Sequence, residues 1–306
     1  VRMYDIQDTL FCDSLIFYNQ ENKTFKKFEN VNFLQKKNKI TCQKLEYHEN
    51  SGFGNRLINI FNNAKIEDSL RIVIGDSIYV QYQDSLLKNI KILSNGEIIN
   101  NRYTKIRKKD KEQTVEDILK SKTILVDFEN SNIEKIYLHG MASTNFNTIE
   151  DSILSGLNIA SGDSIFIDMK DNLIYRMQIK GGGRGEFEPE DSNTRIDSTI
   201  IYKADYIDYQ VKNELSYLYD EAYVNYDFTE LNAGEIFIDW NKNFLEATIK
   251  DSIYPSINGF GESPTYGDKM TFDLITKKGK ILKGMTQFND GYYIGQNIYQ
   301  EESEVF

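Results

Sequence analysis

The amino-acid sequence predicts an all-β fold, an elongated β-solenoid or open sandwich of stacked strand repeats. Apolar and polar residues alternate at period two in many short runs, as they do in half-buried strands. Only 3 of the 306 residues are prolines, so nearly every backbone N–H group is free to join a sheet. The same strand pattern also recurs along the chain, which is typical of stacked units.

Each repeat begins with a marker residue that is followed by apolar residues two, four and six positions later. In the clearest copy Asp268 is the marker, and Met270, Phe272 and Leu274 follow it. A unit of this size cannot cover its own apolar face, so neighbouring copies are expected to share one core. The markers of successive copies are Asp13, Gln43, Asp76, Lys122, Asp163, Asp205, Gly234 and Asp268, and Gln296 begins another.

The residues after Asp268 predict a complete strand–turn–strand unit. Alternation runs through Lys269–Leu274 and again through Lys280–Thr286. The polar connection Thr276–Gly279 lies between these runs, and its glycine can adopt the positive φ that a short hairpin loop needs. Other copies contain similar polar turns, at residues 19–23, 170–172 and 241–243.

Longer intervals between markers predict insertions near residues 100–121 and 181–198. The first contains the basic run Lys105–Lys111, expected in a solvated loop, and the sequence Thr114–Asp117, which could cap a short helix. The second is rich in glycine and acidic residues and predicts a flexible loop. Its Gly181–Gly185 segment lacks the spacing of a phosphate-binding loop.

Composition limits the classes of partner. The chain is long enough to bury a large core, and we expect one repetitive domain over residues 1–306. A formal net charge of -11 and a pI near 4.9 argue against binding to nucleic acid, which requires basic patches. No run approaches the roughly 18 apolar residues of a membrane-spanning helix.

The sequence contains little that would support catalysis. Its only histidines, His48 and His139, lie in different repeats, so neither a Ser-His-Asp relay nor a histidine-based zinc site is expected. Asp239 and Asp273 occupy equivalent positions and could share a divalent cation or act as in polysaccharide-cleaving enzymes. The simpler interpretation is that each hydrogen-bonds its own turn. We therefore expect no enzyme activity, cofactor or metal.

The two cysteines, Cys12 and Cys42, each directly precede a marker. Equivalent positions in adjacent copies are expected to be stacked neighbours. A disulfide in an oxidising compartment and two buried free thiols are both compatible with this placement.

The apolar stripe of the repeat has two interpretations. It could simply be a filled core, or the two sheets could leave an open apolar trough that holds acyl chains, with about 0.8 kcal/mol gained for each buried CH₂ group. The second interpretation makes the inward positions candidate lipid-binding residues. They are Ile78, Val80, Ile124, Val126, Ile165, Ile167, Ile207, Tyr209, Ile236, Ile238, Met270 and Phe272.

The C-terminal third of the chain resembles the OstA/LptD family of lipopolysaccharide-assembly proteins. The resemblance covers roughly residues 197–298. It is carried by Ala204–Ile207, Glu221–Val224, Leu231–Gly234 and Ile238–Trp240, then by Met270–Asp273, Thr276–Gly279 and Asp290–Gly295. The upstream repeats follow the family's pattern more loosely.

The resemblance implies a β-taco, an open-sided V of antiparallel strands whose apolar interior carries the acyl chains of lipid A. It implies a periplasmic location at the outer membrane, with neighbouring bridge proteins docked by edge-strand pairing. An outer-membrane barrel, with its partner lipoprotein, is expected after residue 306. The family's interdomain disulfides do not transfer to Cys12 and Cys42. Alternatives are a soluble OstA-like bridge protein without a barrel, and a closed β-solenoid scaffold or polysaccharide-binding protein.

Overall fold

The structure, a computed structural model, describes residues 2–4, 8–20, 23–35, 38–50, 54–105, 112–130, 132–150, 153–170, 173–190, 196–227, 229–258, 263–288, 291–301 and 304–305. In these residues the chain is almost entirely β-strand, and the one helical segment is the short 3-10 turn η1 (Val211–Asn213). No helix in this part of the chain is long and apolar enough to cross a membrane. The all-β prediction is confirmed.

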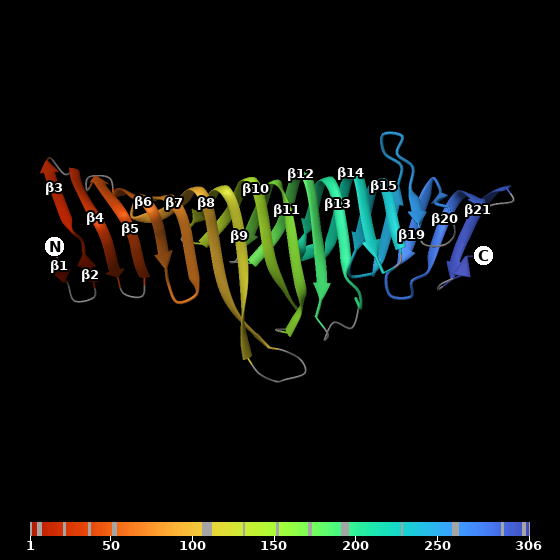
Figure 1. Ribbon diagram of the computed structural model, residues 1–306, viewed down its shortest axis with the longest axis horizontal. Helices are drawn as coiled ribbons and strands as arrows, with labels where there is room; N and C mark the ends of the chain where they lie inside the picture. The colour runs from red at the N-terminus through yellow and green to blue at the C-terminus, as the bar shows by residue number, and fades with distance from the viewer. Residues whose placement is uncertain are drawn as a thin grey trace. The chain divides into compact units, whose positions relative to one another are not determined.

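The described strands follow one another with few interruptions (Figure 1). They are β1 (Arg2–Tyr4), β2 (Asp8–Phe11), β3 (Ser14–Gln20), β4 (Lys23–Gln35), β5 (Asn38–Asn50), β6 (Asn55–Glu67), β7 (Arg71–Gln83), β8 (Leu86–Lys105), β9 (Glu112–Glu129), β10 (Asn132–Glu150), β11 (Ile153–Lys170), β12 (Leu173–Pro189), β13 (Ile200–Gln210), β14 (Leu215–Tyr226), β15 (Thr229–Asp239), β16 (Phe244–Thr248), β17 (Ser256–Asn258), β18 (Thr265–Tyr266), β19 (Lys269–Asp273), β20 (Gly279–Phe288), β21 (Gly291–Glu301) and β22 (Glu304–Val305).

The chain divides into two compact units. Unit 1 comprises residues 1–103, 114–145 and 164–174, and unit 2 comprises residues 104–113, 146–163 and 175–306. Strands β10 and β11 each contribute to both units. The prediction of a single repetitive domain over residues 1–306 stays a prediction.

Each unit contains an antiparallel series of strands in chain order. In unit 1, β3 to β8 pair successively. In unit 2, β12 to β16 do the same, and β16, β19, β20 and β21 continue the series. The hairpin predicted after Asp268 is confirmed, because Phe272 of β19 pairs with Gly279 of β20.

Several markers of the repeat lie where the long strands are bulged, whereas Asp13 and Asp268 lie between two strands. In unit 2, the pairing of β13 with β14 shifts register between Lys203 and Tyr206, around the marker Asp205. The strand opposite has a positive φ at Asp220 and Glu221. In unit 1, the markers Gln43 and Asp76 lie at similar register shifts. Because a bulge bends its strand, each marker at a bulge divides its strand into two arms.

Small residues precede the markers because the interior is crowded at the bend. A Cβ atom added to Gly162 would lie 2.6 Å from Cγ2 of Ile179. Cys12 and Cys42 occupy the same position in their repeats, and both are buried and form no disulfide. Burial raises the pKa of Cys42 to about 11.

The predicted stacking of the two cysteines on adjacent strands is wrong. Strand β4 separates them, since its Asn32 pairs with Phe11, the residue before Cys12, and its Val31 pairs with Cys42. Strands two apart in a sheet are roughly 10 Å apart, which is too far for a disulfide.

Residues that face the interior fall at even-numbered distances from the marker in one arm and at odd-numbered distances in the other. After the marker, in what we call the frame arm, inward residues are two and four positions away, such as Ile207 and Tyr209 after Asp205. Before the marker, in the second arm, inward residues are one, three and five positions away, such as Ala204 and Tyr202. The bulge shifts the alternation by one residue and so causes this change of phase.

Two local predictions are wrong. Thr114–Asp117 does not cap a helix but lies within β9, and β8 continues to Lys105, so most of the predicted insertion at 100–121 is strand. The predicted loop at 181–198 is strand as far as Pro189, with a bulge at Gly181 and Gly182, whose φ angles are 78° and 60°. The basic run after Lys105 lies outside the described residues.

Candidate functional site

Unit 2 contains an apolar cavity of about 280 Å³ between the two arms of its strands. The frame arms of β13 and β15 contribute Ile207, Tyr209 and Ile238 to its wall. The strand segments paired with the β13 frame arm contribute Met177 and Ile179 from β12 and Leu218 from β14, and we count them with the frame arm. The second arm contributes Phe146, Asn158, Phe187, Ile200 and Tyr202. The volume is close to the lower limit of common ligand pockets, so the cavity could hold one short apolar segment.

Glycines in the second arm create this space. Gly185 of β12 pairs with Tyr202 of β13, and the Tyr202 ring occupies the position that a Cβ atom of Gly185 would take. Similarly, Cζ of Phe187 lies 2.6 Å from where a Cβ atom of Gly156 would be. Both rings therefore lie across a neighbouring glycine, along the sheet, and do not fill the space between the arms.

The wall also contains polar side chains, among them Thr148, Glu214 and Asn243. Two hydrogen-bonded pairs of polar groups lie within it. The Tyr202 hydroxyl donates a hydrogen bond to Oδ1 of Asn158 at 2.8 Å, and burial raises the pKa of this tyrosine. Nε1 of Trp240 donates to Oγ of Ser216 at 2.8 Å. Both pairs satisfy groups that would be costly to bury alone.

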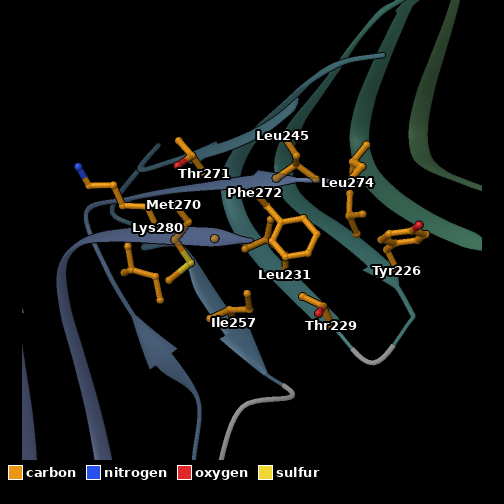
Figure 2. Close-up of a pocket in the computed structure, with 13 residues that line it drawn as sticks. Tyr226, Thr229, Leu231, Leu245, Ile257, Met270, Thr271, Phe272, Leu274 and Lys280 are labelled. Atoms are coloured by element: carbon orange, nitrogen blue, oxygen red, sulfur yellow. The ribbon is translucent and has the colours of Figure 1, made fainter. Parts of the chain in front are cut away.

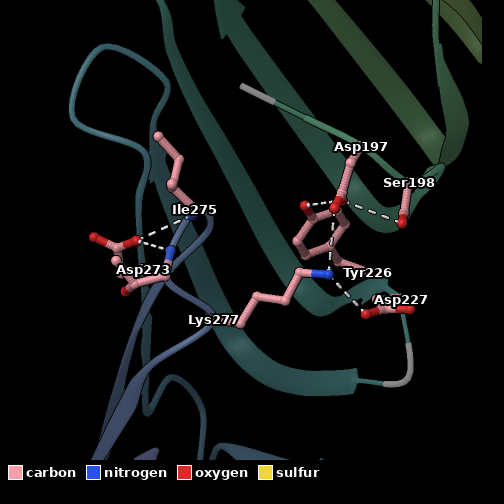
Figure 3. A network of polar contacts seen from close by, with 8 residues as sticks. Asp197, Ser198, Tyr226, Asp227, Asp273, Ile275 and Lys277 are labelled. Atoms are coloured by element: carbon pink, nitrogen blue, oxygen red, sulfur yellow. Dashed lines mark hydrogen bonds and ion pairs between the residues drawn. The ribbon is translucent and has the colours of Figure 1, made fainter. Parts of the chain in front are cut away.

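The segment Ile196–Ser198 lies at one side of the cavity. The Ile196 side chain is buried and forms part of the wall. The next residue, Asp197, is held by a polar clasp (Figure 3). It accepts a hydrogen bond from the Tyr226 hydroxyl at 2.9 Å, and Nζ of Lys277 lies 3.5 Å from it.

Lys277 completes the clasp from the β19–β20 turn. Its ammonium group lies between Asp197 and Asp227, 2.9 Å from the latter, and over the Tyr226 ring at 5.6 Å (Figure 3). The hydrogen bond from Tyr226 is the main cause that lowers the pKa of Asp197. The clasp joins three separate segments of unit 2.

Beyond β15 the space between the arms is nearly filled. A second cavity there has a volume of about 20 Å³, enough for a water molecule but not for an acyl chain. Figure 2 shows Phe272 of the frame arm among Leu231, Leu245 and Leu274, with Met270 nearby.

The predicted lipid-binding residues fall into three groups. Ile207, Tyr209 and Ile238 line the larger cavity, and Met270 and Phe272 line the smaller one. The remaining seven are buried in the interior of their units, namely Ile78, Val80, Ile124, Val126, Ile165, Ile167 and Ile236.

The sequence reasoning missed the second arm. Asn158 and Tyr202 lie five and three positions before their markers, whereas the repeat was defined only by the positions after each marker. A search for alternation at odd positions before each marker would have found them, because the bulge reverses the phase there.

The aspartates of the repeat hydrogen-bond their own turns. Oδ1 of Asp273 accepts from the backbone N–H groups of Ile275 at 3.0 Å and Thr276 at 2.7 Å. Asp239 accepts from the backbone and the ammonium group of Lys242, which lowers its pKa. The simpler interpretation of these residues is confirmed. No cluster of three or more potential metal ligands occurs among the residues that the structure describes.

Unit 1 has a different cavity, an open groove of about 580 Å³ over the hairpin ends of β3 to β7. It is lined by polar residues and aromatic rings, and the guanidinium of Arg56 lies 4.6 Å from the centre of the Tyr82 ring. His48 lines this groove beside Phe25, whereas His139 lies near Ser164.

The chain matches no protein-family model, no curated protein and no solved structure.

Proposed function

We propose that this chain binds lipid acyl chains between the arms of its strands, as a periplasmic, non-enzymatic domain that carries lipopolysaccharide to the outer membrane. The observation that carries the proposal is the cavity in unit 2. Its wall is mainly apolar and combines the inward residues of the repeat with aromatic rings that lie across neighbouring glycines. Burial of an acyl chain against such a wall is favourable without any charged contact.

The charge of the chain fits binding through acyl chains better than binding through head groups. Lipopolysaccharide is anionic and the chain carries a formal net charge of -11, so long-range attraction is absent. Either burial of apolar surface supplies the affinity, or a divalent cation bridges the two negative partners.

We further propose that neighbouring bridge proteins pair with edge strands. Ile16, Phe17 and Tyr18 of β3 are each more than half exposed, and so are Tyr292 and Ile294 of β21. When a partner strand is added to a sheet, backbone hydrogen bonds supply the affinity, and contacts with side chains such as these supply the specificity. Charged substitution of Phe17 or Ile294 should weaken capture of a bridge protein, and unchanged capture would contradict this part of the proposal.

A closed structural scaffold is the second candidate. The wholly buried side chains of the unit 1 interior favour it, since a scaffold needs a filled core and no ligand. Cavity filling in unit 2 separates the two candidates. Ile207→Trp places a large ring in the cavity. Tyr206→Trp is the matched control, because the preceding residue lies on the opposite face of the strand.

The test measures displacement of a fluorescent fatty acid by purified lipopolysaccharide. We expect binding by the wild-type protein and by Tyr206→Trp, and loss of binding by Ile207→Trp with the fold retained by circular dichroism. Absence of binding by the wild-type protein would favour the scaffold.

A further inference from the structure

We propose that the cavity of unit 2 selects acyl chains that carry a hydroxyl group, and that Asn158 and Tyr202 recognise this group. The inference rests on the proposed function, because it takes an acyl chain as the occupant. It adds a chemical requirement that an apolar trough alone would not impose.

The two residues are brought together across an intervening strand. Asn158 lies on β11 and Tyr202 on β13, with β12 between them. Gly185 of β12 leaves the Tyr202 ring room to lie across that strand, so that its hydroxyl reaches Oδ1 of Asn158 at 2.8 Å. Both side chains also line the cavity, among Met177, Ile179 and other apolar groups.

The pair retains hydrogen-bonding capacity toward the cavity. Among the described residues, the structure gives the Asn158 side chain one hydrogen bond, the one it accepts from Tyr202. A primary amide has two N–H donors, and a phenol oxygen that donates its proton can still accept. The Asn158 amide nitrogen can thus donate to a ligand, and the Tyr202 oxygen can accept from one.

A hydroxyl group matches this arrangement best. It accepts a hydrogen bond from the Asn158 amide and donates one to the Tyr202 oxygen, whereas a carbonyl group only accepts. A plain methylene chain does neither and would cover the amide donors with hydrocarbon. Leaving a buried donor without a partner costs enough free energy to lower affinity about tenfold.

The test compares binding of dodecanoic acid with binding of dodecanoic acids hydroxylated at carbon 2, 3 or 12. We expect the wild-type chain to bind at least one hydroxylated acid about tenfold more tightly than the plain acid. In Asn158→Leu this preference should disappear while the plain acid binds as well as before or better. Gly185→Ala should also reduce the preference, because its Cβ displaces the Tyr202 ring.

The outcomes distinguish selectivity from a purely structural role and from failure of the proposed function. Equal binding of all four acids by the wild-type chain would overturn the inference alone, and so would a preference that survives in Asn158→Leu. If the wild-type chain binds none of the acids, the proposed function fails, and the inference fails with it. Thermal unfolding by circular dichroism checks that Asn158→Leu is folded, and Tyr202→Phe provides a second variant of the same pair.

Discussion

In unit 1 the inward residues of the frame arm are buried in the interior, whereas in unit 2 several of the equivalent positions border a cavity. Ile78, Ile124 and Ile165 of unit 1 have no exposed surface. Ile207 and Ile238 of unit 2 are almost as buried from solvent, but they face a volume of about 280 Å³. The difference arises in the second arm, where glycines let aromatic rings lie along the sheet. One strand pattern is thus compatible with a buried core and with a cavity between the arms.

The largest expected effect compares truncation in the two interiors. Ile78→Ala should lower the free energy of unfolding by about 2–5 kcal/mol, because it leaves a void at a position with no exposed surface. Ile238→Ala should cost less, at or below the lower end of that range, since its side chain already adjoins empty space. Urea unfolding monitored by circular dichroism measures both, and equal costs would contradict the difference in packing.

The clasp over the cavity gives a smaller effect. Tyr226→Phe removes the hydroxyl that donates to Asp197 and should cost about 1 kcal/mol. Tyr223→Phe, on the same strand, is the matched control, because no hydrogen bond of that hydroxyl is described, and it should cost close to nothing. Faster hydrogen exchange at Ile196–Ser198 in Tyr226→Phe alone would place the effect at the clasp, and equal exchange in both variants would refute it.

The clasp should also weaken in acid. The pKa of Asp197 is lowered in the folded protein, chiefly by the Tyr226 hydrogen bond and further by Lys277. Its stabilising contribution is therefore complete above its ordinary pKa of 3.8 and is lost as the pH falls through the lowered value. The difference in Tm between wild type and Asp197→Asn should shrink between about pH 6 and about pH 2. A constant difference would exclude this linkage.

The smallest effect concerns salt. Because both lipopolysaccharide and the chain are negative, salt screens a repulsion and not an attraction. Raising NaCl from about 50 mM to about 500 mM should leave the affinity for lipopolysaccharide unchanged or slightly higher. A strong loss of affinity at high salt would indicate that cationic side chains bind the lipopolysaccharide head group. The groove of unit 1, which contains Arg56, would then be the first candidate site.

The sequence predicts the hairpins and the repeat because alternation is a local signal, and turn residues such as Thr276–Gly279 mark where each strand ends. It does not predict the bend, because a bulge of one residue looks like an interruption of the pattern. For that reason Gly181–Gly185 suggests a loop, although Gly185 is in a strand and makes room for a ring. The cavity depends on residues from separate strands, such as Asn158 and Tyr202, and only the fold shows that they meet.

The proposed function places acyl chains between the arms of unit 2. A photo-crosslinking amino acid at Ile238 points into the cavity, and one at the next residue, Phe237, lies on the opposite face, where its ring contacts Tyr217. After incubation with purified lipopolysaccharide and irradiation, we expect a lipid adduct from position 238 and none from position 237. Equal labelling at both positions, or labelling at 237 alone, would contradict the claim.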